Sequence, residues 1–499
     1  MEKKEINKQQ YKSVLKSTSL IGGSAFINIV IGMIRTKFVA ILLGPAGIGL
    51  SNMYHTIITT VSTVTGLGLN SSGVRSIAEA NGQNDSERVS RIIKTIRSTV
   101  WISGIFGTLL IILFSSYISE FTFKTQEHRI SLMFLSVIVL LTNIQVGQTC
   151  ILQGLRKIAD IAKISIWGAV NGTLISIPCF YMWGQNGIVP SLILTAIAAL
   201  LTSWLYAKKI EITHVQLLKE EKKAELRKLL SFGLPQMGVA LLSSVTAYLM
   251  RYVIYNQFNL AGVGIWSAAF NISGVLTNFV LNAMSTDYYP RLSAVATDNE
   301  KIYNEVNTQL EIALLLAGPA LVVTILFAPL GIQILYTGKF NEAIPILRWS
   351  VYGILGRVIT WPLGFIMPAQ GRGSLFFITE LFGQGSLLLL TYLFSLKYGL
   401  PGTGMAMALN YALYLIEMII LSKIIANTTI KNTNWKLILT VFTLCLVASL
   451  LEKAMPSPIY YYIIATILTL ITSYYLFNRL SIKTGVTFKS ILAKIGIKK

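Results

Sequence analysis

Residues 18–43 read TSLIGGSAFINIVIGMIRTKFVAILL, an apolar stretch that carries two cations, Arg35 and Lys37. The stretch is longer than the ~20 residues that a helix needs to cross the hydrocarbon core of a bilayer. A charge near the bilayer centre costs roughly 2.5–3.5 kcal/mol on insertion scales, so such residues persist where they face a polar cavity or a partner. The stretch therefore predicts a membrane-spanning helix with cations that face a polar cavity or a partner, and cations that face a cavity suggest an anionic cargo.

Similar apolar stretches recur along the 499-residue chain, which is 53% hydrophobic and only 13% charged. No segment between them is long enough for a separate soluble domain, and the alternating pattern of a membrane β-barrel is absent. This predicts an all-α polytopic membrane protein with about fourteen transmembrane helices. We place the spans at residues 18–43, 50–78, 94–118, 130–154, 158–182, 187–207, 229–256, 261–290, 306–336, 342–370, 374–397, 401–425, 435–452 and 458–478.

The net charge of +21 follows from membrane topology rather than from nucleic-acid binding. If the N-terminus lies in the cytoplasm, the cytoplasmic segments hold 32 of the 42 Lys and Arg residues and the external loops hold 5. Such a bias is the positive-inside rule, and it places both termini in the cytoplasm. The five remaining cations lie inside predicted spans: Arg35, Lys37, Arg251, Arg348 and Arg357.

The chain also repeats itself, with landmarks of the first half recurring in the second half at a nearly constant offset. The matching landmarks are Arg35 with Arg251, Ala46–Gly49 with Ala261–Gly264, Gln153–Gly154 with Gln370–Gly371, and Gly187 with Gly402. Six spans are repeated, and an even number preserves orientation, so the halves are expected to be parallel repeats.

This repeat predicts four regions along the chain. They are an N-terminal six-helix bundle (1–210), a linker helix at the membrane interface (211–228), a C-terminal six-helix bundle (229–430), and an appended helix pair with a basic cytoplasmic tail (431–499). The linker is highly charged with apolar residues interspersed, which fits an interfacial helix and a solvated linker equally well.

The five intramembrane cations are the candidate substrate-binding residues. Arg offers a bidentate fork for phosphate, and Lys offers a point charge. The alternative for Lys37, Arg251 and Arg348 is that they snorkel to the outer headgroups. For Arg357, which is placed deeper, the alternative is a salt bridge to an intramembrane acid.

Two acids inside predicted spans, Asp287 and Glu417, are candidates for coupling to a proton or a sodium ion. Both acids lie toward the cytoplasmic side, so the alternative to ion coupling is that they pair with a Lys or Arg there. For a third acid, Glu380, the interpretation we favour is pairing with Arg372. Three scattered cysteines and three scattered histidines support neither a disulfide framework nor a metal site. We expect no cofactor, and His55 is expected to be a packing or hydrogen-bonding residue rather than a proton switch.

Short motifs in a consistent order make the chain resemble the Wzx-type flippases of the multidrug/oligosaccharidyl-lipid/polysaccharide exporter superfamily. The resemblance covers roughly residues 15–425, and these motifs carry it: Leu43–Leu50, Asn70–Arg75, Gly262–Trp266, Tyr289–Ser293 and Gly338–Phe340. Lys37 and Arg251 fall where that family has cations in the first and seventh spans, whereas Arg35 and Arg357 are carried over less firmly.

The resemblance implies two six-helix bundles in a V that alternate between inward-open and outward-open states. It implies a flippase for undecaprenyl-pyrophosphate-linked oligosaccharide, such as the O-antigen unit of lipopolysaccharide, in the bacterial cytoplasmic membrane. Membrane lipids, and polymerase and chain-length proteins of the same pathway, would be its partners. The family commonly has twelve spans, so the last two depart from its pattern.

Three other functions compete with that of an oligosaccharide flippase. A flippase for lipid II or a teichoic-acid precursor would also carry an anion and can have fourteen spans. A drug/cation antiporter of the same superfamily would need an intramembrane carboxylate in the first bundle, and spans one to six contain no deeply placed acid. A membrane-embedded glycosyltransferase or polymerase would need acidic or histidine clusters in an external loop, and none is visible. We therefore expect a transporter rather than an enzyme.

Overall fold

The computed structural model describes residues 2–210, 219–455 and 457–484, and every regular element in these ranges is helical. Part of the predicted linker (211–218) and the basic tail beyond residue 484 lie outside the described residues. The chain divides into two compact units, Met1–Tyr252 and Val253–Lys499. The division falls inside the seventh predicted span, and the appended helix pair belongs to the second unit.

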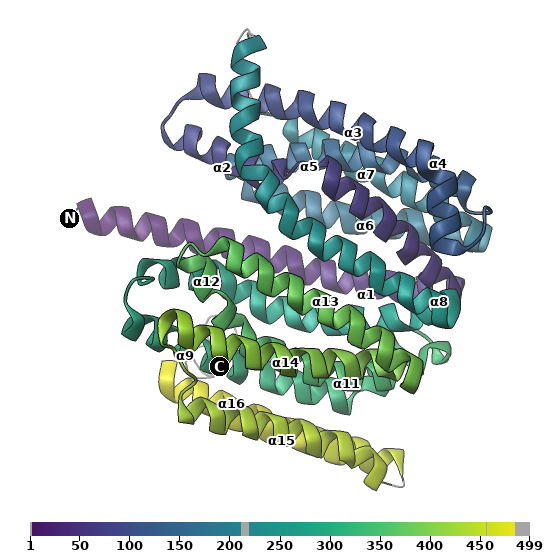
Figure 1. Cartoon of the computed structure of the whole chain (residues 1–499), viewed down its shortest axis with the longest axis vertical. Coiled ribbons are helices and arrows are strands. Elements are labelled where there is room, and N and C mark those ends of the chain that lie inside the picture. The colour runs from purple at the N-terminus through teal and green to yellow at the C-terminus, as the bar shows by residue number, and fades with distance from the viewer. Residues whose placement is uncertain (1, 211–218, 456, 485–499) are drawn as a thin grey trace, which may run out of the picture. The chain divides into compact units, whose positions relative to one another are not determined.

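Among its described residues, unit 1 contains seven α-helices and the first part of an eighth (Figure 1). They are α1 (Glu2–Thr65), α2 (Leu69–Gly82), α3 (Ser86–Phe123), α4 (Arg129–Leu135), α5 (Val137–Gly154), α6 (Ile158–Trp183), the 3-10 turn η1 (Gly184–Gly187), α7 (Ile188–Ala207) and α8 (Lys219–Ala294), whose residues from Val253 onward belong to unit 2.

In the part of unit 2 that the structure describes, the rest of α8 is followed by eight further α-helices. These are α9 (Asn299–Leu326), α10 (Ala328–Leu335), the 3-10 turn η2 (Gly338–Phe340), α11 (Ala343–Gly364), α12 (Ile366–Ala369), α13 (Gly373–Tyr398), α14 (Pro401–Ala426), α15 (Asn432–Ala454) and α16 (Pro458–Thr484).

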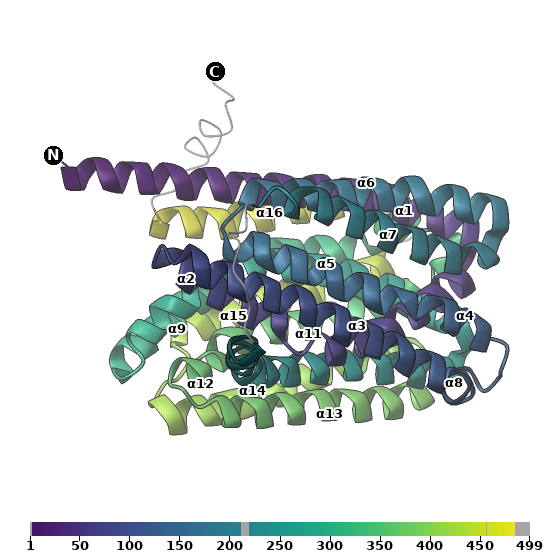
Figure 2. The same ribbon diagram turned by 90° about the horizontal axis from the view of Figure 1, so that it is seen from above.

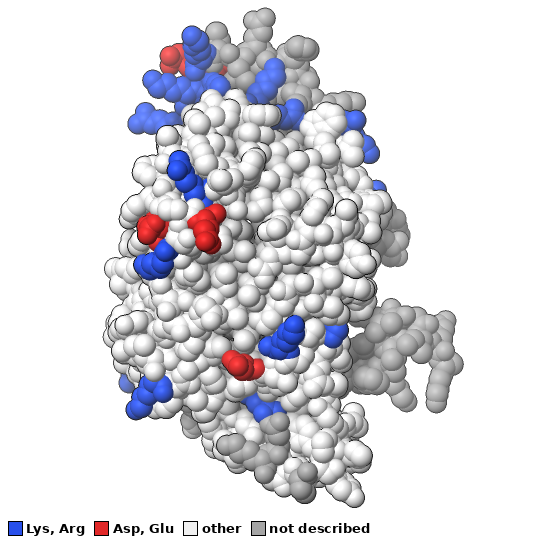
Figure 3. All heavy atoms as spheres, turned by 90° about the vertical axis from the view of Figure 1, so that its right-hand side faces the viewer, with Lys and Arg blue, Asp and Glu red and all other residues white. Residues whose placement is uncertain are grey.

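Eleven helical stretches of the described residues are long and apolar enough to cross a membrane. Three of them, 22–65, 158–207 and 219–275, hold 44, 50 and 57 residues. Each is more than twice the ~20 residues that one pass requires. Each also contains a bend or a 3-10 turn, so the three stretches supply two passes each and the prediction of fourteen is confirmed. Uncharged residues cover most of the face in Figure 3, as a membrane-embedded surface requires.

The sequence repeat appears in the backbone as matching irregularities in the two halves of the chain. Gly44 bends α1 at φ 64° and ψ −172°, and Asn259 bends α8 at φ 56° and ψ −168°. Gly184 and Gly399 both have positive φ directly after α6 and α13, and they are separated by the same offset as the two bends. These bends and caps determine where each pass ends. The two halves of the chain therefore share the same backbone pattern.

The core of unit 1 forms where α2, α3 and α5 meet. Ile77, Ile92, Ile96 and Ile151 are fully buried there. Gly73 permits this approach, since a Cβ at that position would lie 2.6 Å from Cys150 Sγ. In another part of the unit, α6 lies between α1 and α7 and packs against both (Figure 2).

The core of unit 2 centres on α9 and α11. In both helices 72% of the apolar stretch is buried, against 6% in α13. The appended helices α15 and α16 lie beside each other and pack on α9. Gly318 of α9 makes room for both, because a Cβ there would lie 2.6 Å from Leu476 Cδ1 and 3.3 Å from Val441 Cγ2. The last two passes are therefore built into unit 2.

Candidate functional site

Arg35 reaches from α1 toward α6 inside unit 1. Its Nε donates a hydrogen bond of 3.0 Å to Ser176 Oγ, and its side chain is half-buried. Gly172, one turn earlier on α6, leaves space for the guanidinium, since a Cβ there would lie 3.1 Å from Arg35 Nη1. The Ser176 hydroxyl thus holds the guanidinium in place. Because a hydroxyl is neutral, it does not compensate the positive charge of Arg35.

His55 and Arg251 lie in the same region of unit 1 as Arg35. His55 is within electrostatic range of both arginines. Arg251 is half-buried on α8, and its Nη1 donates 2.9 Å to the Ala247 carbonyl of its own helix. The imidazole of His55 is exposed. We call these three side chains, Arg35, His55 and Arg251, the basic cluster.

The bends in α1 and α8 explain why residues so far apart in sequence meet. Arg35 precedes Gly44 on one arm of the bent α1, and His55 follows Gly44 on the other arm. At a rise of about 1.5 Å for each helical position, Arg35 and His55 are about 14 Å and about 17 Å from the bend. Arg251 lies about 12 Å before the bend at Asn259. All three are therefore near the middle of a hydrocarbon layer about 30 Å thick.

The two arginines are not strict repeat equivalents. When the two bends are aligned, with Gly44 on Asn259, Arg251 falls on Thr36 rather than on Arg35. A shift of one position turns a helix by about 100°, so the two guanidiniums leave their helices in different directions. The offset between Arg35 and Arg251 is one residue longer than the offset between the two bends.

Lys37 is half-buried on the same helix as Arg35. Side chains two positions apart on a helix do not face each other. Lys37 therefore points away from Ser176 and from the basic cluster, although it was predicted together with Arg35.

Arg348 and Arg357 lie in unit 2 on opposite sides of α11, because the interval between them corresponds to about two and a half turns. Arg348 Nε donates 3.4 Å to the Ile325 carbonyl and lines a cavity of about 900 Å³ between α11, α14 and α15. Arg357 is exposed and within electrostatic range of Tyr411 on α14. Unit 2 therefore does not gather its two predicted cations at one place.

Asp287 forms part of an ion network at the end of α8. Its Oδ2 lies 2.9 Å from Arg291 Nε, and Arg291 Nη1 lies 2.7 Å from Glu305 Oε2. Arg291 also donates 3.3 Å to Gln309 Oε1. Asp287 is exposed and paired, as one of the two alternatives stated above anticipated.

Glu417 has different surroundings, although sequence analysis treated it like Asp287. Its Oε2 is buried without a hydrogen-bond partner among the described residues, and it is within electrostatic range of Glu380 on α13. Tyr414 donates 3.1 Å to Glu380 Oε1. The pairing we favoured for Glu380 with Arg372 is not among the ion pairs of the described residues. We call Glu380, Tyr414 and Glu417 the acidic cluster.

Two features of interest were not predicted from the sequence. The first is Glu311, a buried acid within α9. Its position inside a predicted span could have identified it as an intramembrane acid. The second is an aromatic group where the end of α3 lies beside the middle of α8, shortly before the bend at Asn259. Tyr252 stacks on Phe121 at 5.1 Å and accepts from Lys124 Nζ at 3.0 Å, while Tyr248 hydrogen-bonds Thr122 at 2.7 Å. The two tyrosines lie one turn apart on α8. Sequence alone cannot tell whether residues at this spacing form a functional group or only pack against a neighbouring helix.

A family comparison and two curated relatives give the chain its context. The sequence model of the family described as "Polysaccharide biosynthesis protein" matches residues 14–296. The chain is 23% identical to the Lipid III flippase of Escherichia coli (strain K12) over 413 residues, which are 81% of this chain and 96% of that protein. It is 20% identical to Stage V sporulation protein B of Bacillus subtilis (strain 168), covering 65% of this chain and 67% of the relative.

Solved structures share the fold at low sequence identity. The lipid II flippase MurJ in an inward closed conformation matches with a TM-score of 0.70 and 15% identity, over 92% of this chain and 99% of that one. An inward-facing multidrug resistance MATE family transporter of the MOP superfamily matches with a TM-score of 0.64 and 16% identity, over 80% and 97%. The all-α, polytopic fold predicted from sequence is therefore confirmed as the fold of these transporters.

Proposed function

This chain belongs to the polysaccharide biosynthesis protein family, and from that premise we propose that it is a flippase for undecaprenyl-pyrophosphate-linked oligosaccharide. It is a multi-pass membrane transporter, not an enzyme. In our proposal it works in the bacterial cytoplasmic membrane with both termini in the cytoplasm. It would move its cargo from the inner to the outer leaflet by alternating access.

The observation that carries this proposal is the basic cluster. His55 lies within electrostatic range of both Arg35 and Arg251, and Arg35 donates to Ser176 of α6, so unit 1 carries positive charge within helices that are apolar enough to cross a membrane. Intramembrane ionisable residues are costly and mark substrate or ion pathways. Arginine forks bind phosphate oxygens through paired, charge-assisted hydrogen bonds. A cargo that carries a pyrophosphate would bring negative charge to these side chains.

The sign of the cluster separates the proposed cargo from a cationic drug. The MATE neighbour shows that the fold serves multidrug transport. Positive charge at mid-membrane repels a cationic drug and attracts an anionic lipid carrier. Outward movement of an anion across an inside-negative membrane also gains roughly 2.3 kcal/mol per charge per 100 mV.

Flipping in proteoliposomes tests the proposal. We expect wild-type protein to flip undecaprenyl-pyrophosphate-linked oligosaccharide, and Arg35→Ala or Arg251→Ala to slow flipping about tenfold or more, since a hydrogen bond to a charged group is worth about 1.5–3 kcal/mol. Arg129→Ala is the matched control, because Arg129 is an exposed arginine at the start of α4. Equal flipping by all variants would reduce the cluster to helix packing. Export of a cationic dye without lipid flipping would favour a drug antiporter.

The acidic cluster supports a second proposal, that a proton drives the cycle through Glu417. Chains of carboxylates inside membrane bundles serve as proton relays in transporters. Glu417 has a buried oxygen with no hydrogen-bond partner among the described residues, whereas Asp287 is paired with Arg291. We therefore assign coupling to Glu417 and a structural role to Asp287.

A further inference from the structure

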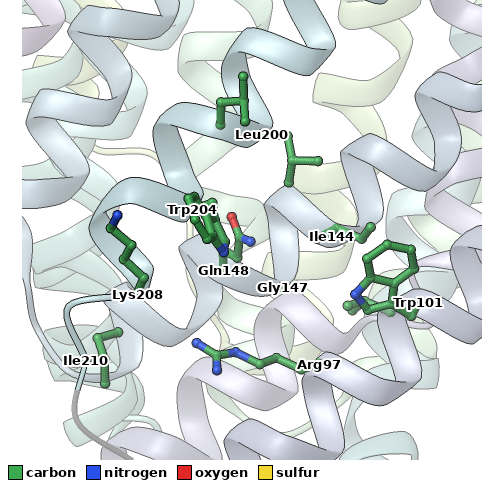
Figure 4. Close-up of a pocket in the computed structure, with 11 residues that line it drawn as sticks. Arg97, Trp101, Ile144, Gly147, Gln148, Leu200, Trp204, Lys208 and Ile210 are labelled. Carbon is green, nitrogen blue, oxygen red and sulfur yellow. The ribbon is translucent and has the colours of Figure 1, made fainter.

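A second basic site lies in unit 1, away from the basic cluster. It is a pocket of about 540 Å³ between α3, α5 and α7 (Figure 4). Arg97 enters it from α3 and Lys208 from the end of α7, with Gln148 and Trp204 nearby in the view. None of the residues that line the pocket is acidic: they are Arg97, Val100, Trp101, Ile144, Gly147, Gln148, Leu200, Leu201, Trp204, Lys208 and Ile210.

The depth of the pocket follows from helix lengths. From Arg97 to Phe123, the last residue of α3, the helix rises by about 39 Å. That distance exceeds the hydrocarbon thickness of about 30 Å. Lys208 directly follows α7, whose 20 residues span that thickness once. Both cations therefore lie at headgroup level, in the cytoplasmic leaflet according to the Lys and Arg distribution.

The polar groups of the pocket are available to a ligand. Arg97 is half-buried and makes no hydrogen bond or ion pair with any described residue. Gln148 is 8% exposed, and its Oε1 accepts from Ser203 Oγ, so the carbonyl end is fixed and the amide nitrogen is left to donate. Lys208 Nζ lies 4.8 Å from the centre of the Trp204 ring, a contact that leaves its N–H groups free for an anion.

The walls of the pocket suit hydrocarbon. Trp101, Leu201 and Trp204 are 51%, 53% and 49% exposed, on helices that cross the membrane. Tryptophan prefers the membrane–water interface, where its ring contacts chains and its N–H contacts headgroups. Basic pockets between transmembrane helices on the cytoplasmic side bind anionic lipid headgroups.

We propose that this pocket binds an anionic phospholipid of the cytoplasmic leaflet. The phosphate lies between Arg97 and Lys208 and accepts from the Gln148 amide. The acyl chains follow Trp101, Leu200 and Leu201 into the bilayer. The site is separate from the proposed path of the cargo, so its test needs no transport.

Native mass spectrometry of the full-length protein provides the test. The protein is released from nanodiscs that contain equal amounts of phosphatidylglycerol and phosphatidylcholine with identical chains. We expect wild type to retain phosphatidylglycerol preferentially. Arg97→Gln and Lys208→Gln should each lower the retained fraction about fivefold, since one cation near a membrane surface contributes about that factor. Arg97→Lys should keep part of the preference, because the charge remains while the fork is lost.

Lys209→Gln is the matched control. Lys209 is exposed, adjacent to Lys208, placed over the Tyr206 ring at 5.1 Å, and does not line the pocket. Lys208 is itself exposed, so its substitution should not affect folding. Equal loss in Lys208→Gln and Lys209→Gln would overturn the proposal in favour of diffuse surface charge. Displacement of the lipid by soluble glycerol phosphate would overturn the role of the acyl chains. If wild type showed no preference for phosphatidylglycerol over phosphatidylcholine, the proposed lipid site would be wrong.

Discussion

Asn259 bends α8 with a backbone conformation, φ 56° and ψ −168°, that side chains rarely adopt. Such positions cost about 1–3 kcal/mol and are essentially restricted to glycine. The repeat equivalent, Gly44, is a glycine. Asn259 offsets part of the cost because its Oδ1 accepts from the Ala261 amide at 2.8 Å.

We predict that Asn259→Gly raises the melting temperature of the detergent-solubilised protein, because relief of strain exceeds the loss of one capping hydrogen bond. Asn259→Val should lower it, since a β-branched residue has no access to this conformation. Differential scanning fluorimetry measures both. A lower melting temperature for Asn259→Gly would mean that the cap outweighs the strain.

His128 gives the protein a pH-dependent contact outside the spans. It is half-buried against Phe123, with ring centres 4.1 Å apart, and shares a 2.7 Å hydrogen bond with the Tyr54 hydroxyl. Burial lowers the pKa of His128, and the charge of Glu127 opposes this effect. The unfolded chain therefore binds a proton at a higher pH than the folded chain does.

We predict that this stabilisation is complete above about pH 6.5 and is lost as pH falls below that value, toward the lowered pKa of the folded state. The melting temperature should fall between pH 7.5 and pH 5.5, and His128→Gln should reduce that fall. An identical pH dependence in both proteins would assign the effect to other groups.

At the scale of elements, the turn between α1 and α2 meets α8 through two glycines. Gly68 has φ 65°, and a Cβ there would collide with the Gly233 carbonyl. A Cβ at Gly233 would lie 2.6 Å from the Leu67 carbonyl oxygen. Arg75 of α2 lies over the Phe232 ring at 4.5 Å and reinforces this contact, and Arg91 Nη1 of α3 lies 3.0 Å from Glu221 Oε1 near the start of α8.

We predict that Gly68→Ala destabilises unit 1 by about 1–3 kcal/mol through overpacking, with further strain from its positive φ. Gly82→Ala is the control: Gly82 is the last residue of α2, and nothing lies within 4 Å of a Cβ placed there. Thermal unfolding should separate the two variants clearly. Equal melting temperatures would show that α8 can shift away from the turn at little cost.

At the scale of the whole molecule, the acids of unit 2 should determine how transport is driven. We predict that a pH gradient accelerates flipping by wild type and by Asp287→Asn in proteoliposomes. Glu417→Gln should lose this response while it keeps flipping driven by membrane potential alone. A response to sodium instead of pH would reassign the coupling ion, and a full response in Glu417→Gln would place coupling elsewhere.

Hydropathy and Lys/Arg bias were enough to predict the helical fold and the fourteen passes, because both reflect the cost of placing each residue in lipid. They did not predict the Gly68–Gly233 contact, since close approach depends on which helices become neighbours. Arg35 and Arg251 were recognisable as costly charges, but His55 joined them only because the bend at Gly44 returns the chain to the same depth. Asp287 and Glu417 looked alike, although Arg291, one turn after Asp287, marked the paired one.

The backbone repeat, in which Gly44 aligns with Asn259, gives each half of the chain a natural comparison for the other. At the positions that correspond to Glu380 and Glu417, the first half has Ser165 and Thr202. The same helical scaffold thus already tolerates neutral hydroxyl side chains where the second half carries acids. This difference makes the two halves chemically distinct, although their helices bend at matching positions.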